Sequence, residues 1–255
     1  MALDSMQEIF DKVRAGDKPF WRVVRDTDVE ERQVTAEASF EKMHATWRAM
    51  VESVDTYRAD RRSVSGLVGG DAQKMWDYAA GQETLCGPYL QEVIATALCV
   101  AESNACMHRI VAAPTAGACG VLPAVLVPLY RRGGVEEDAI VRALYVAAGI
   151  GAVIGYRASI SGASGGCQAE VGTAAAMAAG ALVDLRGGTP EQIGHAVAMA
   201  LKNLLGLACD PVAGLVEVPC VKRNVIGAVN AVSAADMALA GIESRIPVDQ
   251  VIDCM

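Results

Sequence analysis

Three cysteines in the second half of the chain each lie where a helix cannot continue easily. Cys167 follows two glycines, Cys209 lies two residues before a proline, and Cys220 directly follows another proline. A cysteine that only fills space belongs more naturally in the middle of a buried helical stripe. A cysteine on a turn can be aimed at a metal by the backbone around it. Thiolate ligation from such turns is typical of iron–sulfur clusters, and buried structural cysteines are the main alternative interpretation.

Other chemical signatures are missing or weak in this sequence. It has no G-x-S-x-G, H-E-x-x-H, P-loop or C-x-x-C pattern, and its three histidines are too scattered to indicate a zinc site. The glycine-rich segment Ser161–Gly166 would suit a phosphate, but glycine-rich loops alone are weak signals. The turn Pro114–Gly117 offers backbone N–H groups and a hydroxyl, which together form the kind of nest that a carboxylate occupies.

Composition limits the class of protein. The chain has 255 residues, enough to bury a large core. Hydrophobic residues make up 53% of it but aromatic residues only 5%, which is typical of helices that pack closely through small residues. A net charge of −8 argues against nucleic acid or an anionic membrane as a partner. The first residues lack the features of a signal peptide, so we expect a cytoplasmic protein whose eight cysteines are reduced.

The hydrophobic pattern predicts helices and gives no clear strand. Alternating patterns are confined to short, ambiguous pieces near Leu67 and Ile110. The longest apolar stretches, Ala143–Tyr156 and Val171–Val183, are shorter than the roughly 18–20 residues of a membrane span, so we expect buried core helices. The sequence therefore predicts an all-α fold, a compact bundle of small-residue-rich helices whose glycine-rich loops form the site. The other expected helices are Asp4–Val13, Ala36–Ala59, one capped by Asp71, Tyr89–Glu102, Pro123–Tyr130, Glu136–Gly155, one from Pro190 to Leu205, Asn224–Ala240 and one opened by Pro247.

Charge divides the chain into two parts. Charged side chains are much denser in the first 80 residues than afterwards, and a loop rich in glycine and serine begins at Ser63. We therefore expect residues 1–62 to form a charged helical N-terminal arm and residues 63–255 to form the catalytic domain. An apolar stripe on the arm would dock on a partner, or else form the amphipathic edge of a single domain. The stripe consists of Phe40, Met43, Trp47, Met50 and Val54.

Four segments carry a resemblance to a known family. They are Ser63–Lys74, Ser103–Gly120, Ser159–Gly172 and Lys202–Asn224. These segments resemble the α chain of the bacterial iron–sulfur-dependent L-serine dehydratase, also named L-serine ammonia-lyase, and the likeness covers the chain from about Ser63 onward. The resemblance implies that Cys167, Cys209 and Cys220 hold a [4Fe–4S] cluster and leave one iron open to substrate. Cys119 also lies in a matching segment, and we expect it to pack against the site.

The resemblance also implies a reaction. In this family L-serine loses water and yields pyruvate and ammonia, with the open iron acting as a Lewis acid, and such a cluster is sensitive to oxygen. The same chemistry would serve L-cysteine, with sulfide eliminated in place of water. We expect substrate to be oriented by hydrogen bonds from Asn104, Thr115, Ser161 and Ser164. Further substrate contacts are expected from Ser65, Gly66, Gly117, Lys202, Arg223 and Asn224.

Two residues stand out against the family pattern. His108 occupies a position where the family usually has glycine, so it either alters the pocket or points away from it. Cys254 would cap the open iron, as a C-terminal cysteine does in single-chain relatives, or else lie at the surface. No histidine of this chain matches a base of the family. We therefore expect the proton acceptor on a separate β chain, and a homo-oligomer is the other expected assembly.

Two further readings of the site remain open at this point. A pyridoxal-phosphate lyase would use Lys202 or Lys222 as its Schiff base, because that cofactor commonly serves reactions at the α-carbon of amino acids. Against this, the pattern lacks strands alternating with helices. A structural or regulatory subunit whose cysteines only pack in the core is the alternative from outside the enzymes.

Overall fold

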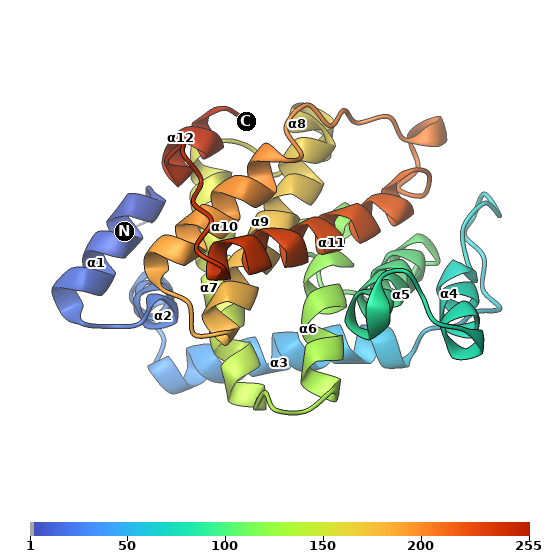
Figure 1. The fold of residues 1–255 in the computed structure, drawn as a ribbon, viewed down its shortest axis with the longest axis horizontal. Coiled ribbons are helices and arrows are strands. Elements are labelled where there is room, and N and C mark those ends of the chain that lie inside the picture. Colours follow the sequence, from blue (N-terminus) through green and yellow to red (C-terminus); the bar gives the residue numbers. More distant parts are fainter. Residues whose placement is uncertain (1–2) are drawn as a thin grey trace.

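The computed structural model describes residues 3–255, and this part of the chain is helical without any β-strand (Figure 1). The all-α fold expected from the sequence is confirmed. The helices are α1 (Met6–Gly16), α2 (Phe20–Arg32), α3 (Ala36–Asp55), α4 (Asp71–Gly81), α5 (Gly87–Ala105), α6 (Val121–Arg131), α7 (Glu137–Arg157), α8 (Gly162–Cys167), α9 (Thr173–Leu185), α10 (Pro190–Lys202), α11 (Cys220–Leu239) and α12 (Val248–Asp253). Short 3-10 turns lie at Ala116–Ala118 and Val212–Gly214, and a π-helical turn, η2, spans Gln168–Gly172.

Helix α9 lies at the centre of the molecule. Its residues from Thr173 to Val183 are all buried and are mostly alanine. Helices α7, α10 and α11 pack around it, and α6 contacts it as well (Figure 1). Alanine and glycine let these helices approach closely: the space where a side chain of Gly180 would begin is filled by the end of Ile150 from α7. Small residues therefore set the spacing of the core.

The N-terminal helices belong to the same core. Helix α2 packs on α7, and α3 runs across α7, α6 and α5 along one side of the molecule (Figure 1). In the apolar stripe, Trp47, Met50 and Val54 are buried against these helices. The expectation that this stripe docks on a partner is therefore wrong, because the stripe is covered by the chain's own helices. A domain boundary at residue 62 stays a prediction.

Helix α2 is not predicted by the hydrophobic pattern. Its sequence is rich in charge, and only Phe20, Val23 and Val24 are buried. Such a narrow apolar face gives little periodic signal, because most of the helix is in contact with water. Its cation-rich side is nevertheless ordered, since Arg25 lies over the ring of Trp21 at 5.3 Å.

The sequence predicts the cap of one helix correctly and the cap of another incorrectly. At α10, the Thr189 hydroxyl accepts from the backbone N–H of Gln192, whose side chain in turn accepts from the N–H of Thr189, so the expected start is confirmed. The side-chain amide of Gln192 also donates to the carbonyl of Ala238, at the far end of α11. Asp71, expected as a cap, is instead the first residue of α4. The buried carboxylate of Glu102 caps this helix by accepting from the N–H of Asp71 at 2.8 Å.

Among residues 3–255, α7 is the one helix whose length and composition would allow it to cross a membrane. Most of its apolar window is buried inside the protein, where it packs against α2 and α9. A core helix passes the same test of length and hydropathy. The expectation of a buried core helix agrees with these contacts, and the absence of a membrane partner stays a prediction.

The small-residue spacing of α9 can be tested by adding one methyl group. Gly180→Ala would place a Cβ against Ile150 and should lower the free energy of unfolding by about 1–3 kcal/mol, the usual effect of overpacking a core. The matched control is Gly155→Ala, at an exposed helical position where the nearest atom is 3.6 Å away. It should raise stability by roughly 0.5–1 kcal/mol, because glycine is a poor helix former. Urea unfolding followed by circular dichroism decides, and equal effects of the two variants would contradict the packing argument.

Candidate functional site

The segments that carry Cys167 and Cys209 are joined through their backbones. The glycine-rich segment expected to be a loop forms the short helix α8, which is kinked at Gly166. Gly166 has a φ of +78°, and a Cβ there would lie 2.9 Å from the carbonyl oxygen of Leu207. Only glycine therefore allows this close approach. The neighbouring Gln168 completes the joint: its backbone N–H donates to Leu207 at 3.0 Å, and its side-chain oxygen accepts from the N–H of Gly206 at 2.7 Å.

Arg223 ties the same two segments to helix α11. Its Nη1 donates to the Sγ of Cys167 at 3.1 Å and to the carbonyl of Ala208 at 2.9 Å, and it lies 2.6 Å from a carboxylate oxygen of Asp210. These three groups flank or belong to the first two cysteines, and Arg223 itself is three residues after Cys220. One side chain thus contacts all three cysteine-bearing segments. Its expected contact with a substrate carboxylate stays a prediction.

Cys220 is the first residue of α11 and is positioned by Asn224 one turn later. Asn224 is 1% exposed, and its amide accepts from the N–H of Gly120 and donates to the carbonyls of Gly117 and Cys220. The structure therefore gives this amide a role in joining the start of α11 to the turn at residues 115–120. Its expected contact with substrate stays a prediction, as does that of Gly117.

The three thiols form one electrostatic unit. Burial raises the pKa of Cys220 to about 11, and negative charge on Cys167, Glu170 and Cys209 adds to the rise. Burial also raises the pKa of Cys167, while the hydrogen bond from Arg223 opposes that effect. Cys167 and Cys220 are buried and Cys209 is exposed. Burial therefore favours the neutral form of both buried thiols, and at Cys167 it outweighs the hydrogen bond from Arg223.

The cysteine donors of this site are thiols on separate segments. Within residues 3–255 no group of three His, Cys, Asp or Glu side chains is arranged to hold a single metal ion. A cubane cluster is larger than one ion, so its cysteine ligands are held further apart than those of a mononuclear site. Three neighbouring thiols on separate segments, with no histidine among them, match the donor set of such a cluster.

Glu170 lies in this site and was not identified from the sequence. It belongs to the π-helical turn η2, three residues after Cys167, and the hydroxyl of Thr115 donates to its Oε1. A Cβ on Gly117 would lie 2.6 Å from the same oxygen. Asn104 supports the turn from the other side by donating to the carbonyl of Ala116 at 3.1 Å. The available signal was a charged residue at the start of the apolar stretch Val171–Val183, because charged residues beside a buried segment often have a partner or a function.

A second carboxylate joins the loop at residues 63–70 to the loop that precedes Cys220. Glu217 is 6% exposed and accepts hydrogen bonds from the hydroxyls of Ser63, at 2.7 Å, and Ser65. Burial acts to raise the pKa of Glu217, but these hydrogen bonds outweigh it and hold the pKa below its usual value. Gly66 forms the turn of the loop with a φ of +77°. Ser65 is thus engaged with the protein, and its substrate contact stays a prediction.

The remaining predicted residues lie near the site or at the surface. Ser161, directly before α8, and Ser164, on α8, are exposed, and the Ser164 hydroxyl lies 3.0 Å from that of Ser159. Lys202 is exposed at the end of α10. Cys119 is buried with a pKa raised by burial to about 12, in agreement with the expected packing role. These serines and the lysine keep their roles in catalysis and substrate binding as predictions, and so does His108. Cys254 is exposed.

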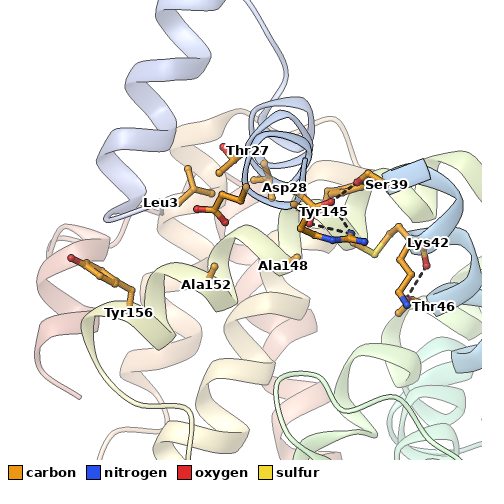
Figure 2. Close-up of a pocket in the computed structure, with 14 residues that line it drawn as sticks. Leu3, Thr27, Asp28, Ser39, Lys42, Thr46, Tyr145, Ala148, Ala152 and Tyr156 are labelled. Carbon is orange, nitrogen blue, oxygen red and sulfur yellow. Dashed lines mark hydrogen bonds and ion pairs between the residues drawn. The ribbon is translucent and has the colours of Figure 1, made fainter. Parts of the chain in front are cut away.

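A cavity of about 250 Å³ lies elsewhere, between α2, α3 and α7 (Figure 2). Figure 2 shows Asp28, Ser39 and Tyr145 gathered on one wall, where the Ser39 hydroxyl lies 2.6 Å from both partners. Ala148 and Ala152 form the wall along α7. No cysteine and none of the predicted site residues lines this cavity. It is therefore distinct from the cysteine site.

Fold and site together define an all-helical protein that gathers three cysteines from separate turns. A family model described as "Serine dehydratase alpha chain" matches residues 16–255. The chain therefore belongs to the serine dehydratase alpha chain family.

The relatives that match the chain include separate alpha chains and a longer protein. It is 49% identical over 228 residues to a probable L-serine dehydratase alpha chain of Bacillus subtilis, covering 89% of this chain and 76% of that one. It is 39% identical over 255 residues to the L-serine dehydratase alpha chain of Peptoniphilus asaccharolyticus, covering 99% of this chain and 87% of that one. An L-serine dehydratase of Mycobacterium bovis is 51% identical over 164 residues, which are 62% of this chain but 36% of that longer protein.

The Glu217 link should make stability depend on pH. Folding lowers the pKa of Glu217 from its value of about 4.5 in the unfolded chain. Glu217 therefore stabilises the fold above pH 4.5, and this stabilisation is lost as the pH falls through the lower pKa of the folded state. Glu217→Gln should therefore cost about 1–3 kcal/mol in the free energy of unfolding at pH 7 and much less near pH 3.5.

The control for this substitution is Glu243→Gln, which removes an exposed partner of Arg245 and should cost less than about 1 kcal/mol. Urea unfolding of the chain at the two pH values measures both. A cost for Glu217→Gln that equals the control at pH 7, or that does not change with pH, would contradict the proposed link.

Proposed function

We propose that this chain is the α chain of an L-serine dehydratase, which eliminates water from L-serine to give pyruvate and ammonia. Membership of the serine dehydratase alpha chain family supports the reaction. The observation that carries the proposal is the clustering of Cys167, Cys209 and Cys220, which the protein holds together through Arg223, Gln168 and Gly166.

The cofactor we propose is a [4Fe–4S] cluster held by these three cysteines. The donor set fits, since it consists of thiols alone and lies partly shielded from water. Three ligands leave one iron of a four-iron cluster without a protein thiolate. When bound, such a cluster supplies a Lewis acid toward the carboxylate and the leaving hydroxyl of the substrate. The accessible iron also makes the loaded chain sensitive to oxygen.

The chain's own residues hold and orient what binds beside the thiols. The side chain of Arg223 is 16% exposed, and its Nη1 donates to Cys167 and Ala208. We expect the rest of the guanidinium to receive the substrate carboxylate. Asn104 and Thr115 fix the turn at residues 115–118 over η2. The exposed hydroxyls of Ser161 and Ser164 face solvent at the start of α8 and supply neutral hydrogen bonds.

The structure disfavours the pyridoxal-phosphate alternative. A lysine that forms a Schiff base is usually desolvated, because burial lowers its pKa and frees its lone pair. The side chain of Lys222 is 68% exposed and lies 3.1 Å from the carboxylate of Asp71. Lys202 is exposed as well. Elimination of sulfide from L-cysteine at the same site remains the alternative within this chemistry.

We further propose that a β chain docks beside the site. Exposed apolar side chains lie on the two loops that Glu217 joins, among them Val64, Leu67, Val212 and Val216, which are 88%, 64%, 53% and 46% exposed. Apolar groups gathered at the rim of a site are typical of an interaction surface. A β chain at this rim would bring the proton acceptor that the sequence of this chain does not supply.

The ligand assignment is tested by single serine substitutions. Cys167→Ser, Cys209→Ser and Cys220→Ser should each abolish cluster retention after anaerobic reconstitution, because two thiolates do not hold a cubane securely. Cys86→Ser and Cys106→Ser, which change an exposed and a half-buried thiol, are the controls and should retain the iron. Iron and sulfide analysis with the visible spectrum measures the outcome. Full iron content in any of the first three variants would refute the assignment, and iron below about one per chain in the unmodified protein would favour a structural subunit.

The partner assignment is tested by pyruvate release under anaerobic conditions. The reconstituted chain alone should turn over L-serine poorly, and the separately produced β chain should restore turnover. Leu67→Glu should raise the β-chain concentration that is required to restore turnover at least tenfold, because it places a charge in the apolar rim. The control is Leu85→Glu, at a fully exposed position on another loop. Full turnover without a β chain would place the proton acceptor in this chain.

A further inference from the structure

The carboxylate of Glu170 lies against two separate segments of the chain. The Thr115 hydroxyl donates to Oε1, and the backbone of Gly117 lies directly against the carboxylate, where no side chain would fit. On the other side, a Cβ on Gly162 would lie 3.0 Å from Oε2. Neither glycine has a positive φ, so what matters at these positions is the space beside the carboxylate, which is tightest at Gly117. The two glycines let the carboxylate lie flat between α8 and the turn at residues 115–118.

The negative charge of Glu170 has no cationic partner in the described part of the chain. Ion pairs join many carboxylates of residues 3–255, but none involves Glu170, and its Oε2 accepts no hydrogen bond there. The side chain is only partly exposed. It is close enough to Cys119, Cys167 and Cys220 to raise the pKa of each thiol. A shielded carboxylate among thiols is costly unless a cation approaches it.

We propose that Glu170 binds the α-ammonium group of the amino-acid substrate and selects 2-amino acids over acids that lack the amine. This inference rests on the proposed function, since it assigns a place to one group of L-serine at the same site. The substrate carries one cation, its ammonium. Among the described residues, Glu170 and Glu217 are carboxylates of the site without a cationic partner, but Glu217 is already satisfied by the hydroxyls of Ser63 and Ser65. Oε1 is occupied by Thr115, and Oε2 is the free acceptor. Arg223, on the other side of Cys167, suits the opposite end of the substrate.

The geometry assigns Glu170 a specificity role that neutral hydroxyls do not fill. Hydroxyl groups such as those of Ser161 and Ser164 accept from an ammonium and from a hydroxyl alike, so they discriminate poorly between amino acids and hydroxy acids. A carboxylate in a shielded site favours a cation strongly, because the charge-assisted hydrogen bond is roughly twice as strong as a neutral one. Loss of the charge should therefore weaken binding of amine-bearing ligands selectively.

The test compares Glu170→Gln with the matched control Thr115→Val. Glutamine keeps the shape of the side chain and an oxygen for Thr115 but removes the charge, whereas valine removes the Thr115 hydrogen bond and leaves the charge. Both variants are loaded with the cluster, assayed with the β chain where it is required, and checked for unchanged iron content. Calorimetry measures the Kd of L-alanine and of propanoate, which differ only in the amine. Kinetics give the KM for L-serine and the Ki of 3-hydroxypropanoate.

Glu170→Gln should raise the Kd of L-alanine and the KM for L-serine about tenfold or more. The Kd of propanoate and the Ki of 3-hydroxypropanoate should stay within about twofold. Thr115→Val should change the Kd or KM of each amine-bearing ligand and the Kd or Ki of its amine-free counterpart by similar factors. Equal losses for both classes in Glu170→Gln would show a structural role and overturn the inference. A loss of kcat with unchanged KM and Kd would overturn it too, since Glu170 would then act on a proton. Absence of pyruvate from L-serine with the unmodified protein would instead refute the proposed function.

Discussion

The contact between Arg223 and Cys167 is the interaction on which the site depends. Cys167, Cys209 and Cys220 come from separate parts of the chain, so the fold must bring three segments together. The guanidinium supplies positive charge beside Cys167 and binds the backbone beside Cys209 at the same time. Gly166 and Gln168 remove the remaining freedom, because they fasten one segment directly to the other. The protein therefore organises its three thiols with its own groups.

The helical core explains how loops so rich in glycine are kept in place. Helix α9 consists largely of alanine, and α7, α10 and α11 approach it closely. Close packing of this kind leaves helices little freedom to slide. The site segments emerge directly from these helices: η2 leads into α9, and Cys220 begins α11. The rigidity of the core is thereby passed to the thiols over one or two turns of helix.

Sequence patterns revealed the parts of this protein that depend on local chemistry. The capping of α10 follows from neighbouring residues, so it was predictable. The glycine and proline beside Cys167 and Cys220 indicated a break in helix, and the structure places these cysteines at the end of α8 and the start of α11. For Trp47, the sequence predicted only that it lies on the apolar face of a helix. Hydrophobic periodicity indicates that such a face is covered, but it does not indicate which part of the protein or of a partner covers it. Helix α2 escaped notice because its apolar face is narrow. Glu170 escaped because its meaning depends on Thr115 and Gly117, which are more than fifty positions away in the chain.

Helix α11 behaves as a rod fixed at both ends. At its start, Asn224 joins it to the turn at residues 115–120, and at its end the side chain of Gln192 binds the carbonyl of Ala238. Twenty residues of helix span about 30 Å. Gln192 also closes the first turn of α10, so a single amide sets the register between two helices. Cys220 at the start of α11 and the capping residue Gln192 beside its end are thus joined through one helix. The placement of Cys220 therefore depends on a helix that is fastened at both of its ends.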